Sequence, residues 1–406
     1  MTITVWSHFS QILTLSGVHK KSGRYLKPDD LGIISDGTIV FDESKILWVG
    51  ETSKLESKYK HIAAKNFSGH TLAPELVDSH THLVFSGNRA HEYASRLNGV
   101  DYQAIAEQGG GILFTVKETT LLRRSELFEI AKKRVEDIFL LGVGTIEIKS
   151  GYGLSLDKER ELTLVIDDLK KYFKPRVQIL NTFMAAHAIP KNFKSGQEYL
   201  NNVVFPLLDE FSNMNIIDFI DIFHEQGYFT TSEVESFFDY GVKNGYHLKI
   251  HADEFNDNQG ASLAAKYSAI SADHLLKTSP NSAEKLAQSK CVGTLLPGTG
   301  FFLGKPCADA RMLLDKGVQI AIASDYNPGS CHCDNLLLIA SISAPSLKLN
   351  LAELWASITY NAAAALNLTN QGALIANFAS RFTIFKCQDI QEITYNWGKN
   401  LVLRID

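Results

Sequence analysis

Two histidines spaced two residues apart, His80 and His82, follow an apolar-rich stretch at residues 71–77. If that stretch is a β-strand, its side chains alternate between two faces. Both imidazoles then project to the same side, roughly 7 Å apart along the chain. Two imidazoles in this arrangement can bind one metal ion. Taken alone, the pair fits equally well with two polar residues that leave a strand for a loop.

Three later segments repeat the pattern of a short apolar run followed by residues that could bind a metal or move a proton. These polar ends contain His251, Asp253 and Glu254, then Asp273 and His274, then Asp325. Each lies where a strand would finish, and together they favour the metal site over the loop interpretation.

A site built from His80, His82, His251 and Asp325 would offer three imidazoles and one carboxylate. This donor set suits zinc or iron(II), and a position left open to water makes the arrangement catalytic. Because a bound metal lowers the pKa of water from about 15.7 to about 7, the predicted chemistry is hydrolytic. It requires no nucleophilic Ser or Cys.

Proton transfer would need a further carboxylate and imidazole, for which Glu254 and His274 are the candidates. A lone Glu in a loop is often only solvated, and a His at a strand end is often only hydrogen-bonded. Their position beside a predicted ligand, at strand ends, favours the functional interpretation.

The elements that would position these residues alternate between strands and helices from about residue 70 to 345. The predicted strands are residues 76–82, 144–148, 177–183, 217–223, 247–251, 269–274, 292–296 and 318–324. Helical periodicity marks residues 127–141, 156–172 and 232–244 between them. Eight strands separated by helices predict an α/β protein with a (β/α)8 TIM-like barrel, in which chemistry sits at the carboxyl ends of the strands.

The two ends of the chain have a different pattern. Residues 33–40 and 45–50 predict short strands, and Asp36-Gly37 indicates a turn between apolar runs. A helix is expected at residues 351–366, followed by strands at 382–385 and 401–404. We therefore expect a small β-sandwich domain formed by both ends, with its N-terminal part at residues 1–66, a barrel at 67–350, and a connecting helix and C-terminal part at 351–406.

The length and the composition of the chain are those of an ordinary globular protein. The chain has 406 residues, 45% of them hydrophobic and 21% charged, and a net charge of -5 with no basic cluster, which argues against a nucleic-acid partner. No signal-peptide pattern and no membrane-length apolar run are seen, so we expect a cytoplasmic protein without a membrane partner. Five cysteines suit reduced thiols, and Cys331-His332-Cys333 is interpreted as a loop rather than a second zinc site.

The residues described above resemble the metal-dependent amidohydrolase superfamily over nearly the whole chain, and more narrowly the imidazolonepropionase family. The narrower likeness rests on six segments in order: FSGNR at 85–89, GGGI at 109–112, KSGYGL at 149–154, AAH at 185–187, HADE at 251–254 and SDYNPGS at 324–330. The resemblance implies hydrolysis of 4-imidazolone-5-propanoate to N-formimidoyl-L-glutamate in histidine degradation. It also implies a homodimer and one divalent or trivalent metal ion per subunit, zinc or iron, on the four ligands named above.

The resemblance further implies a set of substrate contacts: Arg89, Tyr152, His187, Glu254, Asn327, Gly329 and Ser330. A guanidinium suits the free carboxylate of the substrate, because it can bind a carboxylate through two parallel hydrogen bonds. The alternatives are a surface salt bridge for Arg89, a packed core side chain for Tyr152 and a strand cap for His187.

As a mechanism we expect water activated by the metal to attack the ring carbonyl. Glu254 would orient the water or a ring nitrogen, His274 would stabilise the oxyanion, and Asp325 would pass a proton to the leaving nitrogen. The fourth strand ends at Phe223-His224-Glu225, with no Lys to bridge two metals, so one metal is expected unless Glu225 bridges.

Two alternatives stay open at this point. A metal-dependent aminohydrolase that deaminates a heterocyclic base could use the same histidines and Glu254, although a neutral base has no use for Arg89. A non-catalytic relative would be expected to lack metal ligands, and none is missing here.

Overall fold

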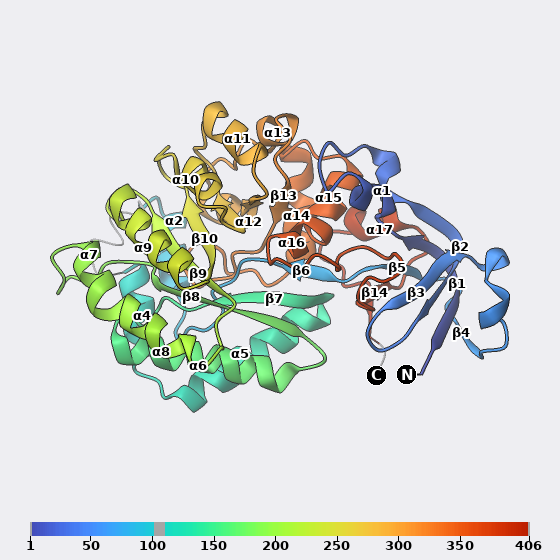
Figure 1. The fold of residues 1–406 in the computed structure, drawn as a ribbon, viewed down its shortest axis with the longest axis horizontal. Helices are drawn as coiled ribbons and strands as arrows, with labels where there is room; N and C mark the ends of the chain where they lie inside the picture. The colour runs from blue at the N-terminus through green and yellow to red at the C-terminus, as the bar shows by residue number, and fades with distance from the viewer. Residues whose placement is uncertain (1, 101–109, 405–406) are drawn as a thin grey trace.

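The computed structural model describes residues 2–100 and 110–404 of the chain and shows a parallel barrel beside a second, smaller sheet (Figure 1). The predicted architecture, a (β/α)8 barrel with a β unit built by both chain ends, is confirmed. No helix in the described part of the chain is both long and apolar enough to cross a membrane.

The barrel strands follow one another in chain order, each parallel to its neighbour. They are β6 (Leu76–Asp78), β7 (Val143–Lys149), β8 (Gln178–Ala186), β9 (Phe219–His224), β10 (His247–Ala252), β11 (Ser271–His274), β12 (Val292–Leu295) and β13 (Ile320–Ile322). All eight lie within three residues of the predicted start, because each is a short apolar run bounded by turn residues.

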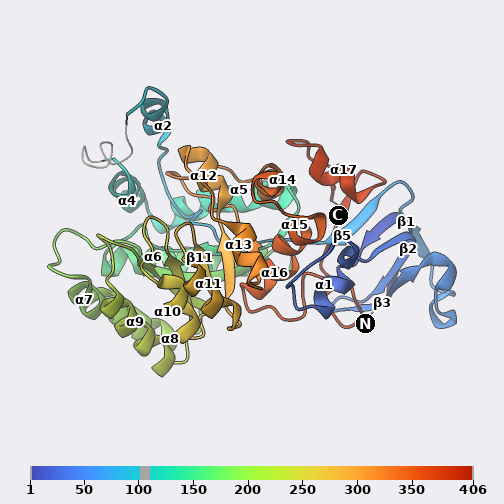
Figure 2. The same cartoon turned by 90° about the horizontal axis from the view of Figure 1, so that it is seen from above.

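Helices cover the outside of the barrel (Figures 1 and 2). They are α4 (Ile112–Thr120), α5 (Arg124–Leu140), α6 (Leu156–Phe173), α7 (Gly196–Tyr199), α8 (Phe205–Ser212), α9 (Thr231–Lys243), α10 (Gly260–Lys266), α11 (Pro280–Ala287), α12 (Pro297–Leu303), α13 (Ala310–Asp315) and α14 (Leu336–Ser346). In α5 the buried residues Leu127, Ala131, Val135 and Ile138 recur at helical spacing, which gives this helix one apolar side toward the barrel. The helix α2 (Ala90–Leu97) projects beyond this layer (Figure 2).

The barrel closes between its first and last strands through residues just beyond their ends. Asp78 accepts hydrogen bonds from the amide and the hydroxyl of Ser324, at 3.0 and 2.5 Å. Next to this pair, Thr81 and Tyr326 form a parallel β-bridge. Closure therefore involves the same short segments that carry His80, His82 and Asp325.

The opposite, amino-terminal end of the barrel is filled by α16 (Tyr360–Ala364) and the residues after it. A separate apolar cluster packs this helix against the barrel interior; its buried members are Val77, Leu180, Phe219, Val292, Ala321, Ala362, Ala363, Ala365 and Leu366. The amino-terminal end of the barrel is therefore blocked, which leaves the carboxyl ends of the strands as the place for chemistry.

The predicted helix at 351–366 is wrong as one element. The structure has α15 (Leu351–Ser357) and then α16, separated by Ile358 and Thr359. The break has a tertiary cause, because the carbonyl of Ile358 accepts a hydrogen bond from Val77 of the first barrel strand at 2.9 Å.

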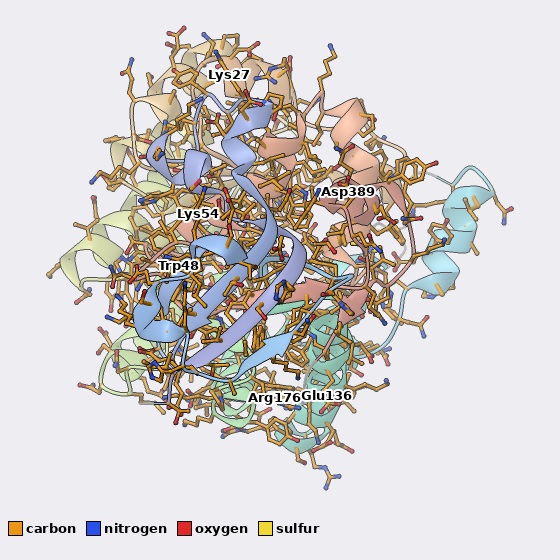
Figure 3. The ribbon with its side chains drawn as sticks, turned by 90° about the vertical axis from the view of Figure 1, so that its right-hand side faces the viewer. Lys27, Trp48, Lys54, Glu136, Arg176 and Asp389 are labelled. Atoms are coloured by element: carbon orange, nitrogen blue, oxygen red, sulfur yellow. The ribbon has the colours of Figure 1, made fainter. Side chains whose placement is uncertain are left out.

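Strands from both chain ends form the smaller sheet, in the order β15-β14-β5-β1-β2-β3 with β4 paired to β1. Their bounds are β1 (Thr4–Leu13), β2 (Ile33–Phe41), β3 (Ile46–Glu51), β4 (Ala64–Asn66), β5 (Thr71–Pro74), β14 (Phe382–Phe385) and β15 (Val402–Leu403). Viewed from this end, Trp48 and Lys54 face the reader, with Lys27 above them and Arg176 below (Figure 3). Helices α1 (Ser16–Lys20) and α17 (Ile390–Tyr395) accompany the sheet. The domain boundaries at 66 and 350 stay a prediction.

The turn predicted at Asp36-Gly37 is also wrong, because both residues lie inside β2. They face an irregularity in the pairing of β1 with β2, where Trp6 pairs with Ile39 and Phe9 pairs with Gly37. Asp36 has a φ of 42°, so the Asp-Gly pair makes a local bulge rather than a hairpin end.

One buried ion pair joins the C-terminal segment to the barrel. Glu75 accepts hydrogen bonds from Arg381 and from Thr145 of β7, and its side chain is 7% exposed. We expect Glu75→Ala to lower the free energy of unfolding by about 3 kcal/mol, because it leaves a half-buried guanidinium unpaired. Urea titration would measure the change.

Glu51→Ala is the control, since Glu51 pairs with Lys54 at the surface. The side chain of Glu51 is 48% exposed and that of Lys54 is 70% exposed. That variant should lose about 0.5 kcal/mol or less. Equal losses in both variants would contradict a linking role for Glu75.

Candidate active site

Five residues with metal-binding or proton-transfer chemistry meet at the carboxyl ends of the barrel strands. His80 and His82 follow β6, His251 is the penultimate residue of β10, His274 ends β11 and Asp325 follows β13. Their exposed fractions are between 0 and 4%. Because neighbouring parallel strands end at one edge, residues far apart in sequence come together here.

The donor atoms of the four predicted ligands face one another. His82 Nε2 lies 3.2 Å from His80 Nε2 and 3.4 Å from His251 Nε2. Asp325 Oδ1 lies 3.6 Å from His80 Nε2 and 3.8 Å from His82 Nε2. Two atoms bound at about 2.0–2.1 Å to a tetrahedral zinc ion would lie roughly 3.3 Å apart, so this donor set fits a metal ion of that size.

The electrostatics of the imidazoles also suit a metal. Burial, together with Lys149 and the neighbouring imidazoles, lowers the pKa of His80 and His82 well below its ordinary value. The pKa of His251 is lowered in the same direction, first by burial. All three are therefore neutral at pH 7, which is the form that binds a metal.

Two carboxylates orient these rings: Asp273, which the sequence marks at a strand end, and Asp221, which it does not. His80 Nδ1 is hydrogen-bonded to Asp273 Oδ2 at 2.7 Å, and His251 Nδ1 lies 3.1 Å from Asp221 Oδ2. A carboxylate on Nδ1 fixes the proton there and leaves Nε2 as the metal ligand. A charged residue inside an otherwise apolar strand is the sequence signal that could have found Asp221.

Asp325 is held by the loop that follows it. Its Oδ2 accepts hydrogen bonds from Thr299 at 2.6 Å and from Ser330 at 3.4 Å, and its backbone carbonyl accepts one from Asn327. Asn327 Oδ1 in turn accepts from the amides of Gly329 and Ser330, both at 2.8 Å. Burial raises the pKa of Asp325 to about 7, so a proton can reside on this group near neutrality.

Glu254 and His274 lie next to each other, with Glu254 Oε2 3.6 Å from His274 Nδ1. Burial, with the nearby charges of Asp325 and Glu225, raises the pKa of Glu254 well above its ordinary value. Burial lowers the pKa of His274 to about 4. Environments that move the pKa values of a carboxyl and an imidazole this far are typical of acid–base sites.

Glu225, considered from the sequence as a bridge between two metals, has another function. Its carboxylate accepts hydrogen bonds from the amides of Phe255 and Asn256, at 2.7 and 3.2 Å, and from the side chains of Asn256 and Asn258. It thereby fixes the loop that directly follows Glu254.

Arg89 lies against the loop after β13. It is 7% exposed, its Nε and Nη2 are each 2.7 Å from Glu92 Oε2, and the other Glu92 oxygen accepts from the amide of Gly111. A Cβ at position 329 would fall 2.0 Å from Arg89 Nη1, so only glycine lets the guanidinium approach there. This burial makes the surface salt-bridge interpretation of Arg89 wrong. Gly109, part of the GGGI segment, lies outside the described residues.

Tyr152 and His187 line the same region. The ring of His187 stacks on His82, with centroids 5.0 Å apart, and the ring of Tyr152 lies 5.5 Å from that of His187. The loop carrying Tyr152 is fixed by buried Glu159, which accepts hydrogen bonds from the amides of Gly151, Gly153 and Leu154. All twelve residues predicted from the sequence thus lie at one edge of the barrel.

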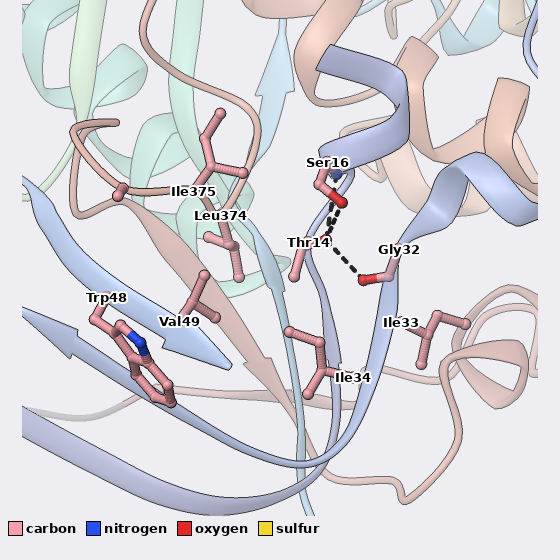
Figure 4. A pocket seen from close by; sticks show the side chains of 10 residues that line it. Thr14, Ser16, Gly32, Ile33, Ile34, Trp48, Val49, Leu374 and Ile375 are labelled. Atoms are coloured by element: carbon pink, nitrogen blue, oxygen red, sulfur yellow. Dashed lines mark hydrogen bonds between the residues drawn. The ribbon is translucent and has the colours of Figure 1, made fainter. Parts of the chain in front are cut away.

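The hollow beside the small sheet and the cysteines show no sign of a second reactive site among the described residues. A hollow of about 420 Å³ beside the small sheet is lined by groups such as Thr14, Trp48 and Ile375, and none of its lining residues is ionisable (Figure 4). The five cysteines are free, as predicted. Among the described residues, no group of metal-binding side chains includes Cys331 or Cys333.

Sequence comparison places the chain in a known family, although no family model matches it. A curated imidazolonepropionase of Bacillus velezensis is 38% identical over 404 residues, covering 99% of this chain and 95% of that protein. The chain belongs to the imidazolonepropionase family. A second family member, from Staphylococcus saprophyticus, is 40% identical over 385 residues and covers 94% of this chain and 91% of that protein.

Solved structures support the family's barrel fold. A 5-methylcytosine deaminase from Klebsiella pneumoniae matches with a TM-score of 0.73 and 14% identity, covering 98% of this chain and 95% of that one. An atrazine chlorohydrolase from Arthrobacter aurescens, crystallised with zinc, matches with a TM-score of 0.68 and 14% identity, over 95% and 88% of the two chains.

The donor set predicts which imidazoles hold a metal. We expect His82→Ala to lose at least nine-tenths of its bound metal, because two of the short donor contacts involve this ring. Elemental analysis of the purified variants would measure the metal content.

His274→Asn is the informative comparison, because donor atoms of His80, His251 and His274 also lie within 4.8 Å of one another. We expect this variant to keep its metal. Metal loss in His274→Asn would show that His274 is itself a ligand.

Proposed function

We propose that this protein hydrolyses 4-imidazolone-5-propanoate to N-formimidoyl-L-glutamate, adding one water molecule across the ring carbon–nitrogen bond. The observation that carries the proposal is a sequence identity of 38% and 40% to two imidazolonepropionases along nearly the whole chain. The buried side chains that could bind a metal, which meet at the carboxyl ends of the barrel strands, support it. The substrate is a small molecule with a cyclic amide and a free carboxylate.

We propose that one metal ion, zinc or iron, is held by His80, His82, His251 and Asp325. When bound, such an ion supplies Lewis acidity, which lowers the pKa of water and polarises a carbonyl group. Support comes from the spacing of the donors and from the neutral state of the buried imidazoles. The atrazine chlorohydrolase of similar fold was crystallised with zinc.

The roles in catalysis are assigned to three buried groups whose pKa values are displaced from their ordinary values. Glu254, with a raised pKa, would orient the water or a ring nitrogen. His274, neutral at pH 7, would donate a hydrogen bond to the carbonyl oxygen as charge develops there. Asp325 would carry the proton to the nitrogen that leaves.

Substrate binding is assigned to side chains and loops that surround these groups. The guanidinium of Arg89 would bind the propionate group, and the loop residues Asn327, Gly329 and Ser330 would border it. Tyr152 and His187 would contact the ring. On the family resemblance alone, we also propose a cytoplasmic homodimer, which light scattering would test for the oligomeric state.

A deaminase acting on a heterocyclic base is the alternative function. A neutral base would leave the buried guanidinium of Arg89 without a carboxylate from the substrate. The solved deaminases share the fold at 14% identity, which favours neither function.

Loss of ultraviolet absorbance from freshly prepared imidazolone propionate would test the proposal directly. We expect turnover by the purified protein and loss of turnover after chelation, with recovery on adding zinc or iron. A metal-loaded protein that leaves the substrate intact would contradict the function, and ammonia release from nucleobases would then support the deaminase.

A second prediction concerns the loop that carries Tyr152. Glu159→Gln removes a charged acceptor of three backbone amides, so we expect the Michaelis constant to rise about tenfold, equivalent to about 1.4 kcal/mol, with a smaller change in kcat.

Glu161→Gln on the same helix is the matched control. Glu161 pairs with Lys158 near the surface, so both kinetic constants should stay within about twofold of the unmodified protein. An unchanged Michaelis constant in Glu159→Gln would show that the loop does not depend on this carboxylate.

A further inference from the structure

A cluster of ionised side chains lies directly beneath the predicted metal ligands, inside the barrel. Its members are Glu147 and Lys149 of β7, Asp221 of β9, Lys249 of β10 and Asp273 of β11. All five have an exposed fraction of 0%. Two ammonium groups therefore face three carboxyl groups in a place closed to solvent, where each charge needs a partner.

The ammonium of Lys149 sits where the three carboxyl groups converge. Its Nζ lies 2.6 Å from Asp221, 3.0 Å from Glu147 and 3.5 Å from Asp273. Three strands of the barrel, β8 to β10, lie between the first and last of these partners, so no local sequence pattern produces the arrangement. The contacts are those of a cation in a carboxylate cage.

Lys249 carries the same charge but occupies a different place. Its Nζ lies 2.8 Å from Glu147 and donates a hydrogen bond to the backbone carbonyl of Ser79 at 3.1 Å. Asp273 is 3.9 Å away, at the limit of an ion pair. Lys249 thus lies at the edge of the cluster, whereas Lys149 lies at its centre.

The carboxylates that Lys149 binds also orient the rings of two predicted metal ligands, His80 through Asp273 and His251 through Asp221. The donor atoms of Asp221, His251 and Asp273 all lie within 4.8 Å of one another, as do those of His80, Glu147 and Asp273. Oxygen and nitrogen donors so close together are a possible second cation site. The lysine ammonium lies among them.

We propose that Lys149 is a positioning residue whose ammonium acts as an internal cation beneath the metal centre. It keeps Asp221 and Asp273 as partners of the ligand imidazoles, and it excludes a second metal ion, so that the chain binds one. The inference rests on the proposed metal centre and explains why that centre would hold one metal ion and not two. Without the ammonium, the three carboxyl groups face Lys249 alone and become available as ligands.

The test is the metal content of three proteins: the unmodified chain, Lys149→Met and Lys249→Met. Both substitutions remove one buried positive charge from the same cluster, so the second is a control for charge loss alone. Each protein is equilibrated with excess zinc, freed of unbound metal and analysed for metal per chain. We expect one ion in the unmodified chain, one in Lys249→Met and two in Lys149→Met.

Cobalt loading gives an independent readout. Two Co²⁺ ions sharing the Asp221 and Asp273 carboxylates should couple magnetically in Lys149→Met, and the coupling should be absent from the other two proteins. One ion in folded Lys149→Met, or two ions in both variants, would overturn the proposal. If Lys149→Met is not recovered from ordinary medium, zinc in the medium should restore it, and failure with zinc would also overturn the proposal.

These measurements need no substrate, so the two proposals fail separately. An unmodified chain with one metal that does not open the imidazolone ring would refute the proposed function and leave the role of Lys149 intact. An unmodified chain that binds two metal ions would refute the role of Lys149 whatever its activity.

Discussion

Three carboxyl groups and two ammonium groups lie without exposed area beneath the strand ends, and the rest of the site depends on how their charges are compensated. Isolated ions in such a place would cost several kcal/mol each, so every one must be paired or hydrogen-bonded. Glu147 pairs with both lysines, while Asp221 and Asp273 each present one oxygen, Oδ2, to both a lysine and an imidazole. The orientation of the predicted metal-binding rings is therefore a consequence of charge burial.

Barrel closure couples the site to the fold. The residues that join the first strand to the last, Asp78 with Ser324 and Thr81 with Tyr326, alternate with His80, His82 and Asp325. A backbone hydrogen bond from Asp325 to the carbonyl of His80, at 3.0 Å, belongs to the same ladder. The separation of these ligands is thus fixed by strand pairing.

Three residues at the same edge have strained backbone conformations. His274 and Asp325 have φ values of 79° and 51°, and Asp253 has 53°, in the left-handed region that residues with a side chain seldom adopt. Each turns the chain sharply as it leaves a strand, and the surrounding hydrogen bonds hold it there. For Asp253 these come from the amide of Gly260 and the hydroxyl of Thr278, both at 2.8 Å.

The sequence predicted the barrel well because its strands are short, apolar and separated by helices with clear periodicity. It drew attention to the predicted ligands because they stand at strand ends, where a polar residue after an apolar run is visible. Lys149 and Asp221 were not predicted as parts of the site, since a charged residue within a strand shows neither its direction nor its partners on other strands. The break at Ile358 was missed for a related reason, because its cause is a hydrogen bond to a strand 281 positions earlier in the chain.

One loop connects the two halves of the proposed chemistry. Asp325 begins it, Asn327 braces it through the amides of Gly329 and Ser330, and Gly329 lies against the guanidinium of Arg89. Because these contacts are short and buried, the distance from the metal ligands to the guanidinium is set by a rigid turn. A substrate whose carboxylate stands at the matching distance from its reacting carbonyl satisfies both ends, whereas a neutral ring satisfies only one. Selectivity for an acidic cyclic amide then follows from the loop itself, because the same turn holds the reacting end and the charged end of the substrate.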